Sequence, residues 1–399
     1  MSKNHKVFGI DVDALNMREI ILDIKKIHLY GFDFYKFVKE CVMANLQIKK
    51  VASSMEDEIF QQPKILELIL RTYVAPDGYI ILNAPTKIDK IVLVASGSSY
   101  HCARLSAEIF GLVADIEARA IYSSEFLIKK IVPHDKNVLY IFITQSGETT
   151  DTLSALNKAK QLEMRTMCIT NKENSSAWMT ADYRINCLAG EEKSIASTKA
   201  LTAQMLCLYL LALKYAQIRE MDVSVRLKQL NSLPEIVEDT LALTDKIRPF
   251  ARFLSKYKDI IIAADGVSYA LAKEACLKIK ETSYINVMSH ILGEFMHGHL
   301  AVLNNKKTVL VYVSSEELSY STIKNLEKIK RDYNPPICVI GTSSERINST
   351  FNVDLEVEDN ILKMFSNAVI SQLLALYIAE KLNRNVDKPK GLKKIVTEV

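Results

Sequence analysis

The stretch Val92-Leu93-Val94-Ala95-Ser96-Gly97-Ser98-Ser99-Tyr100 indicates the class of fold. Four apolar residues run directly into a turn of glycine and serine, which is typical of a buried strand that leads into a helix. Because the apolar run is continuous rather than alternating, the strand is expected to be covered on both faces. Strands of that kind belong to parallel sheets that lie between layers of helices.

The same pattern occurs again 169 positions later, at Ile261–Tyr269. Two further apolar runs repeat in the same order at a spacing of 170: Val138–Thr144 matches Thr308–Ser314, and Met167–Thr170 matches Ile337–Ile340. Three ordered matches at nearly one spacing indicate two copies of one domain. Strands that alternate with helical stretches predict a doubly wound, flavodoxin-like α/β fold with a parallel sheet in each copy.

The repeat also divides the chain into segments. We expect a helical leader over residues 1–54, a first domain over 55–218, a helical connector over 219–256, a second domain over 257–385 and a C-terminal tail over 386–399. A length of 399 residues suits two such domains, at roughly 100–200 residues per domain.

Composition excludes several classes of protein. The chain has 51 Lys and Arg against 47 Asp and Glu, a net charge of +4, and no block of like charges that would bind nucleic acid. Its seven cysteines are scattered without a C-x-x-C pair, which favours a reducing compartment over disulfides or zinc. No signal peptide is present, and the longest apolar run, Met205–Leu213, is about half a membrane span. We expect a soluble, cytoplasmic protein with no nucleic-acid or membrane partner.

Small hydroxyl residues gather where the strands of the first copy are expected to end. Ser96–Ser99 follows the first strand, Thr144–Thr152 follows the next, and Ala196–Lys199 opens a later helical run. One such cluster alone is better explained by turn and N-cap chemistry. Three clusters at strand ends of one domain favour a phosphate site, because hydroxyls and free N–H groups at helix N-termini bind phosphate without many cations.

The second copy has lost much of this pattern. Asp265–Ser268 keeps one serine, and Ser314–Glu317 places carboxylates where a phosphate would sit. We therefore expect the first copy to bind an anion and the second to supply scaffold and catalytic groups.

These clusters carry a specific resemblance. Thr144–Thr149 together with Ala196–Lys199 is similar to the sugar isomerase (SIS) domain. From Met55 onwards the chain resembles the isomerase portion of the glutamine–fructose-6-phosphate aminotransferases, also called glucosamine-6-phosphate synthases. The motifs that carry this likeness, in order, are Met55-x-x-Glu58-Ile59-x-x-Gln62-Pro63, Leu277–Tyr284, Gly293–Gly298 and Asp387–Thr397.

The resemblance implies a set of residues that bind fructose 6-phosphate. The residues expected to hold its phosphate or border its sugar are Ser98, Ser99, Thr144, Gln145, Ser146, Thr149, Ile195, Ser197 and Glu274.

The resemblance also implies four catalytic residues. Glu281 is expected to move a proton between C1 and C2, and Lys278 to lie near the reacting end of the sugar. Lys394 is expected to form an imine with the open-chain ketone. His297 is expected to open the sugar ring and to reach into the active site of a neighbouring subunit, which implies a homodimer.

These assignments suit the chemistry of the side chains. A carboxylate in a dry pocket carries protons between carbons, histidine titrates in the range that ring opening needs, and a lysine imine acidifies the adjacent C–H. Glu274, Lys278 and Glu281 fall at i, i+4 and i+7, so they share one helix face. The alternative to a catalytic role for these three residues is a solvated helix face with one ion pair. The alternative for His297 is a structural histidine. His297 and His299 flank a glycine, but no further ligand cluster accompanies them. We expect no metal and no cofactor.

Two departures from the family pattern affect the predicted reaction. The family has Lys-His-Gly-Pro where this chain has Met296–His299. Its glutaminase domain begins with a catalytic cysteine, whereas Ser2 follows Met1 here and few residues precede Met55. We therefore expect the chain to take nitrogen from free ammonia, to receive it from a separate glutaminase subunit, or to run a reaction that needs none.

Three functions remain open at this point. The first is synthesis of glucosamine 6-phosphate from fructose 6-phosphate and ammonia. The second is a catabolic amino-sugar-phosphate deaminase or fructosamine-6-phosphate deglycase. The third, a sugar-phosphate sensor without catalysis, is disfavoured because Glu281, His297 and Lys394 are all present.

Overall fold

The computed structural model describes residues 6–7, 10–11, 53–130, 137–313, 319–341 and 347–394. The chain forms two compact units, Met1–Ala52 and Ser53–Val399. In the first unit, β1 (Lys6–Val7) pairs antiparallel with β2 (Ile10–Asp11). Most of the predicted helical leader, the predicted strand end at Ser314–Glu317 and the chain after Lys394 lie outside the described residues.

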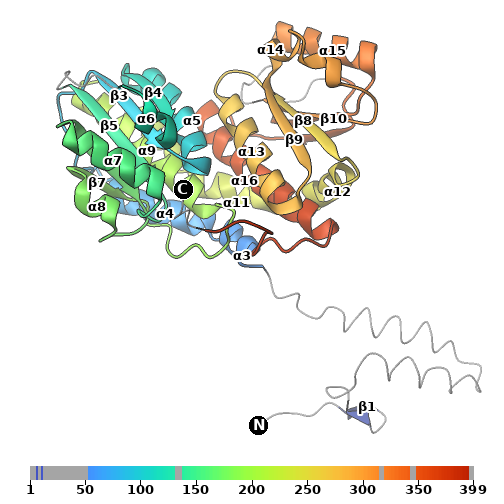
Figure 1. Ribbon diagram of the computed structural model, residues 1–399, viewed down its shortest axis with the longest axis horizontal. Helices are drawn as coiled ribbons and strands as arrows, with labels where there is room; N and C mark the ends of the chain where they lie inside the picture. The colour runs from blue at the N-terminus through green and yellow to red at the C-terminus, as the bar shows by residue number, and fades with distance from the viewer. Residues whose placement is uncertain are drawn as a thin grey trace, which may run out of the picture. The chain divides into compact units, whose positions relative to one another are not determined.

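In the second unit, the first domain is built on a parallel sheet of five strands in the order β4-β3-β5-β6-β7 (Figure 1). The strands are β3 (Lys90–Ala95), β4 (Glu117–Tyr122), β5 (Val138–Thr144), β6 (Arg165–Thr170) and β7 (Tyr183–Asn186). The helices between and after them are α5 (Gly97–Ala114), α6 (Ser123–Ile128), α7 (Thr150–Gln161), α8 (Ser176–Thr180) and α9 (Lys199–Ile218). Buried side chains of α6, α7 and α8 pack on one face of the sheet, and those of α5 and α9 pack on the other.

The second domain repeats this architecture with the strand order β9-β8-β10-β11-β12, again all parallel. Its strands are β8 (Asp259–Ala264), β9 (Asn286–Ile291), β10 (Thr308–Tyr312), β11 (Ile337–Gly341) and β12 (Phe351–Asp354). Its helices are α13 (Ser268–Ser283), α14 (Leu292–Phe295), the 3-10 helix η2 (His299–Val302), α15 (Tyr320–Tyr333) and α16 (Asn360–Lys381). The predicted doubly wound α/β fold, present twice, is confirmed.

The predicted alignment of the two copies is wrong by one residue at the second and third strands. Leu93 and Ile262 are equivalent residues of the first strands, 169 positions apart. Leu93 pairs with Ile141 and Ile262 pairs with Leu310, so Ile141 corresponds to Leu310 at the same spacing. By the same register Met167 corresponds to Cys338, at a spacing of 171. The matches predicted at 170 join residues on opposite faces of the sheet, because successive side chains of a strand alternate between faces.

A single hydrophobic core joins the two domains. It contains apolar side chains of α5 and α9 from the first domain and of α13 and α16 from the second, and α13 packs against both α5 and α16. The helices that complete it are α3 (Ser54–Phe60), α4 (Gln62–Tyr73), α10 (Ser224–Leu230), α11 (Leu233–Ala242) and α12 (Thr244–Leu254). The last three lie within the predicted connector.

Two of the core helices, α9 and α16, are long and apolar enough to cross a membrane by length and composition alone. Their most apolar windows are 89% and 100% buried inside the protein. Their hydrophobic surface is therefore already covered by the fold, and they serve as central core helices.

Candidate functional site

A cavity of about 260 Å³ lies where the carboxyl ends of β3 and β5 meet α13 and the C-terminal tail. The carboxyl edge of a parallel sheet is where ligands bind in doubly wound folds. Eleven of the thirteen predicted site residues line the cavity, and the two that do not are Glu274 and His297. The other lining residues are Ser96, Gly97 and Thr152 from the predicted hydroxyl clusters, Leu392 and Lys393 from the C-terminal motif, and Ile143 and Glu192.

One end of the cavity carries a hydroxyl cluster, which comprises Ser98, Ser99, Thr144, Ser146 and Thr149. Thr144 Oγ1 lies 3.1 Å from Thr149 Oγ1 and accepts a hydrogen bond from Gly147 N at 3.3 Å. The cluster lies at the N-termini of α5 and α7, where backbone N–H groups and the helix dipole favour an anion.

The turn between β5 and α7 depends on Gly147. Its φ of +71° is unfavourable for residues with a side chain, and a Cβ atom there would lie 2.0 Å from Ser175 Oγ. This glycine therefore lets the turn fold closely against the start of α8 and present its hydroxyls to the cavity.

Helix α13 contributes a row of charged side chains, of which Glu274 also makes a side-chain hydrogen bond with Ser98 of the hydroxyl cluster. Lys278 Nζ lies 2.6 Å from Glu281 Oε2 and 3.6 Å from Glu274 Oε1, as expected for residues on one helix face. Lys278 and Glu281 line the cavity, whereas Glu274 is fully buried behind them. Glu274 was predicted to border the substrate; the structure places it in contact with Lys278 instead.

Burial and ion pairing together set the pKa values of Lys278 and Glu274. Burial alone would lower the pKa of Lys278, but Glu281 and Glu274 outweigh it and raise the pKa above its ordinary value. Burial alone would raise the pKa of Glu274, but Lys278 and then His101 outweigh it, and the pKa lies below its ordinary value. Both groups are therefore charged at neutral pH.

His101 was not predicted. It lies on α5, and its Nδ1 is 2.6 Å from Glu274 Oε2, so the row of polar contacts continues from α13 into the first domain. The residue directly follows the stretch that predicted the first strand and helix. Nothing in the sequence pairs it with a carboxylate 173 positions away.

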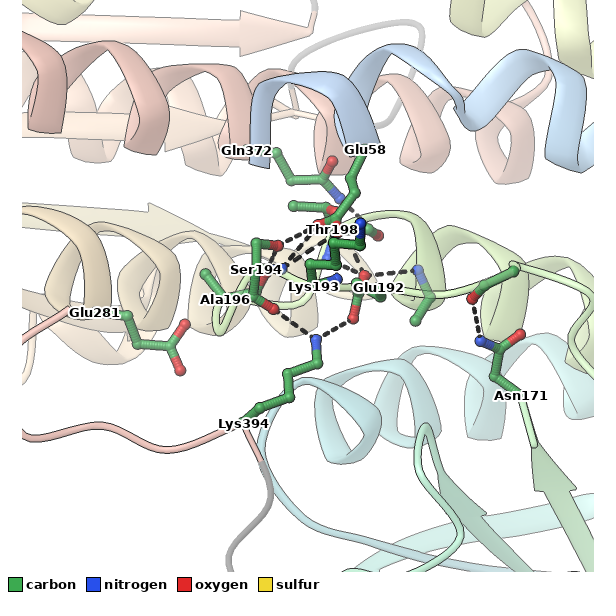
Figure 2. A network of polar contacts seen from close by, with 12 residues as sticks. Glu58, Asn171, Glu192, Lys193, Ser194, Ala196, Thr198, Glu281, Gln372 and Lys394 are labelled. Atoms are coloured by element: carbon green, nitrogen blue, oxygen red, sulfur yellow. Dashed lines mark hydrogen bonds and ion pairs between the residues drawn. The ribbon is translucent and has the colours of Figure 1, made fainter. Parts of the chain in front are cut away.

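The C-terminal tail brings Lys394 to the cavity, where its Nζ donates to Glu192 Oε2 at 2.5 Å and to the backbone oxygen of Ser194 at 2.7 Å. Figure 2 shows this lysine reaching from the tail to the loop before α9. Glu192 Oε1 accepts from Thr198 N at 2.9 Å and from Ala200 N at 3.1 Å. Sequence reasoning missed Glu192, since one of two adjacent glutamates in a loop gives no signal of burial.

The loop that carries Glu192 is held from behind by α3. Glu58 is buried and accepts hydrogen bonds from the backbone N–H groups of Lys193 and Ser194 and from the Ser194 hydroxyl (Figure 2). Burial raises the pKa of Glu58, although these hydrogen bonds act in the opposite direction. Gln372 of α16 supports the same loop by donating to the Thr198 oxygen at 3.2 Å.

The tail also binds the start of α3. Asp387 Oδ2 accepts from Ser54 N at 2.9 Å, and its Oδ1 accepts from Met55 N at 3.0 Å, so the carboxylate satisfies two free N–H groups of the helix. The first and last quoted motifs of the sequence therefore meet in the structure and together position Lys394.

His297 lies apart from the other predicted catalytic residues. It is exposed, between α14 and η2, and does not line the cavity of its own chain. Its neighbour His299 lies against His290, with ring centroids 4.6 Å apart. Within the described parts of the chain, no group of three or more His, Cys, Asp or Glu side chains is arranged to hold a metal ion.

Most of the chain is similar to known proteins. The SIS domain family model matches residues 86–214 and 253–379. The glutamine–fructose-6-phosphate aminotransferase (isomerizing) of Campylobacter jejuni is 35% identical over 349 residues, and that of Clostridium acetobutylicum is 33% identical over 361. Each match covers 86% of this chain, which spans 58% of the length of each relative.

Solved structures agree with this assignment. The C-terminal domain of glucosamine-fructose-6-phosphate aminotransferase from Francisella tularensis matches with a TM-score of 0.80 and 27% identity, over 86% of this chain and 99% of that one. The glucosamine-6-phosphate deaminase of Thermotoga maritima shares the fold, with a TM-score of 0.69 and 21% identity over 86% of this chain and 99% of that one. The resemblance drawn from the sequence motifs is confirmed.

Proposed function

This chain belongs to the SIS domain family, and we propose that it is a sugar-phosphate isomerase that makes glucosamine 6-phosphate from fructose 6-phosphate and ammonia. The observation that carries the proposal is the composition of the cavity. It combines a hydroxyl cluster suited to phosphate with the Lys278–Glu281 pair and the tail lysine Lys394. The names of the full-length relatives agree with this substrate.

The hydroxyl cluster and the charged residues of the cavity have different roles in this proposal. The hydroxyl cluster binds the 6-phosphate, and the open-chain sugar extends from it towards α13 and the tail. Lys394 forms an imine at C2 of the ketone, and ammonia displaces the lysine to leave an imine on the sugar. Glu281 then takes a proton from C1 and returns it to C2, while the hydroxyl proton at C1 passes to the nitrogen. The product is the 2-amino aldose, and water is the only other product.

Lys278 suits the isomerisation step. Negative charge develops on the oxygen at C1 as its hydroxyl proton leaves, and a fixed cation in a buried site stabilises it. The raised pKa of Lys278, caused by Glu281 and Glu274 despite burial, keeps that cation present. Its hydrogen bond to Glu281 also orients the carboxylate for proton transfer.

The active form in this proposal is a cytoplasmic homodimer, in which His297 of each subunit opens the sugar ring in the site of the other. The exposed position of His297, outside the cavity of its own chain, supports this arrangement. A separate glutaminase is a further candidate partner, as a source of ammonia.

The test is an amino-sugar assay on the purified protein. Fructose 6-phosphate is supplied with ammonium, with glutamine, or with neither, and glucosamine 6-phosphate is measured by mass spectrometry. We expect product with ammonium, and its loss in Glu281→Gln. If no product forms but ammonia is released from glucosamine 6-phosphate or fructosamine 6-phosphate, the enzyme is a deaminase or deglycase.

A further inference from the structure

Glu192 occupies an unusual position for a carboxylate. Its side chain is fully buried, and its two oxygens have different partners. Oε1 is fixed by two N–H groups at the start of α9, while Oε2 faces the cavity and lies 2.5 Å from Lys394 Nζ (Figure 2). The carboxylate is therefore held rigidly, with one oxygen directed at the lysine.

A lysine forms an imine only as a neutral amine, so Lys394 must lose a proton before it attacks the ketone. Among the residues that the structure describes, few groups near Lys394 are able to accept a proton. Ser194 contributes a backbone carbonyl, Lys278 and Lys393 are cations, and Glu281 is already paired with Lys278. Glu58 faces away, towards the N–H groups of the loop. Glu192 is the carboxylate in hydrogen-bonding contact with the lysine.

We propose that Glu192 is the proton acceptor that frees the amine of Lys394 for imine formation. The inference rests on the proposed function, because it assumes the imine. The proton passes from the ammonium of Lys394 to Glu192 Oε2, and the neutral amine adds to C2 of the ketone. Glu192 then returns the proton to the C2 hydroxyl, which leaves as water, and the cationic imine remains beside the regenerated carboxylate.

The contacts of Glu192 allow a substitution that isolates this role. In Glu192→Gln the amide oxygen can keep its hydrogen bonds with Thr198 and Ala200, so the start of α9 remains capped, but the group facing Lys394 accepts no proton. Glu192→Asp keeps the acid on a shorter side chain. Glu191→Gln is the matched control, because this neighbouring glutamate is exposed.

Imine formation is followed by mixing enzyme with fructose 6-phosphate, quenching with borohydride, and measuring the modified Lys394 peptide by mass spectrometry. At pH 7 we expect Glu192→Gln to form the adduct slower than wild type by on the order of 100-fold, the usual effect of losing a positioned base. The difference in the rate of adduct formation between Glu192→Gln and wild type should become smaller as the pH approaches about 10, where lysine side chains in general lose their proton to solvent. Glu192→Asp should retain part of the rate, and Glu191→Gln all of it.

The possible results distinguish a failure of the inference about Glu192 from a failure of the proposed function. An adduct that forms equally fast in Glu192→Gln and wild type overturns the role of Glu192 and leaves the proposed function in place. A defect of the same size at every pH also overturns it, because lost packing would not respond to the protonation of the amine. If wild type gives no adduct on Lys394 at any pH, both the imine and the inference are wrong.

Discussion

Nδ1 of His101 on α5 lies 2.6 Å from Oε2 of Glu274 on α13, and this buried hydrogen bond joins the two domains behind the cavity. Glu274 also lies next to Lys278, which lines the cavity. The placement of the lysine therefore depends on a histidine from the other domain.

Replacing His101 with alanine should destabilise the protein by about 3 kcal/mol, because it leaves a buried carboxylate without one of its partners. Urea unfolding at pH 7 measures the change. His299→Ala removes an exposed histidine and serves as the control. A loss of stability no larger in His101→Ala than in the control would show that the buried pair contributes little.

The pH dependence of stability should report Glu274. Its pKa lies below the ordinary value of 4.5 because Lys278 and His101 outweigh the effect of burial. A carboxyl group whose pKa is lower in the folded state stabilises the fold at any pH above its pKa in the unfolded state. This stabilisation is lost as the pH falls through its pKa in the folded state. Glu274→Gln should therefore be less stable at pH 7 and should show a shallower fall in stability below about pH 4.5. Urea midpoints between pH 7 and 3 test this, and parallel profiles would contradict it.

Loss of a hydroxyl from the cluster should weaken substrate binding. Ser146→Ala and Thr149→Val should each raise KM by roughly 10-fold with a smaller effect on kcat, since a hydrogen bond to a charged group contributes on the order of 1.5–3 kcal/mol and the phosphate does not react. Thr180→Val is the control, because that hydroxyl bonds within its own helix. An unchanged KM in both cluster variants would place the phosphate elsewhere.

Complementation between subunits tests the role of His297. His297→Ala and Lys394→Ala should each fold normally and each lose activity. Coexpression of the two should restore about a quarter of wild-type activity, because half of the dimers are mixed and each mixed dimer has one complete site. Lys394→Ala coexpressed with Glu281→Ala should restore none, since both groups line the cavity of one chain. Purified mixed dimers without activity would show that His297 does not act across the interface.

Asp387→Ala should affect stability and activity together. The loss of two hydrogen bonds at the start of α3 should lower stability by about 1 kcal/mol, as for other helix caps. The tail that carries Lys394 would also be released, so kcat should fall more than KM changes. Asp332→Ala, on the surface helix α15, is the control. Full activity in a destabilised Asp387→Ala variant would show that the tail is positioned by other contacts.

The sequence predicted the fold and most of the cavity lining for one physical reason. Buried parallel strands give continuous apolar runs, and their carboxyl ends meet at one edge, so hydroxyl residues after β3 and β5 were expected to lie together. The same continuity caused the error in register. With apolar residues on both faces, the sequence around Ile141 carries no alternation that would fix which face each residue takes.

The contacts that position the site residues could not be predicted from local sequence patterns, because they join residues far apart in the sequence. Glu192 meets Lys394 across 202 positions, and Glu58 meets Ser194 across 136. A glutamate that will be buried and paired looks, in the sequence, like any glutamate on a surface. The resemblance to a family identified Lys394, but the residues that hold it emerged only from the folded chain.

The long separation between Ser54 and Asp387 has a consequence for biosynthesis. Synthesis proceeds from the N-terminus, so the hydroxyl cluster leaves the ribosome long before the tail does. A chain halted short of residue 387 contains the residues of the hydroxyl cluster but lacks both the carboxylate that binds the start of α3 and the lysine. The groups of the cavity are therefore synthesised at different times, and the lysine is added last.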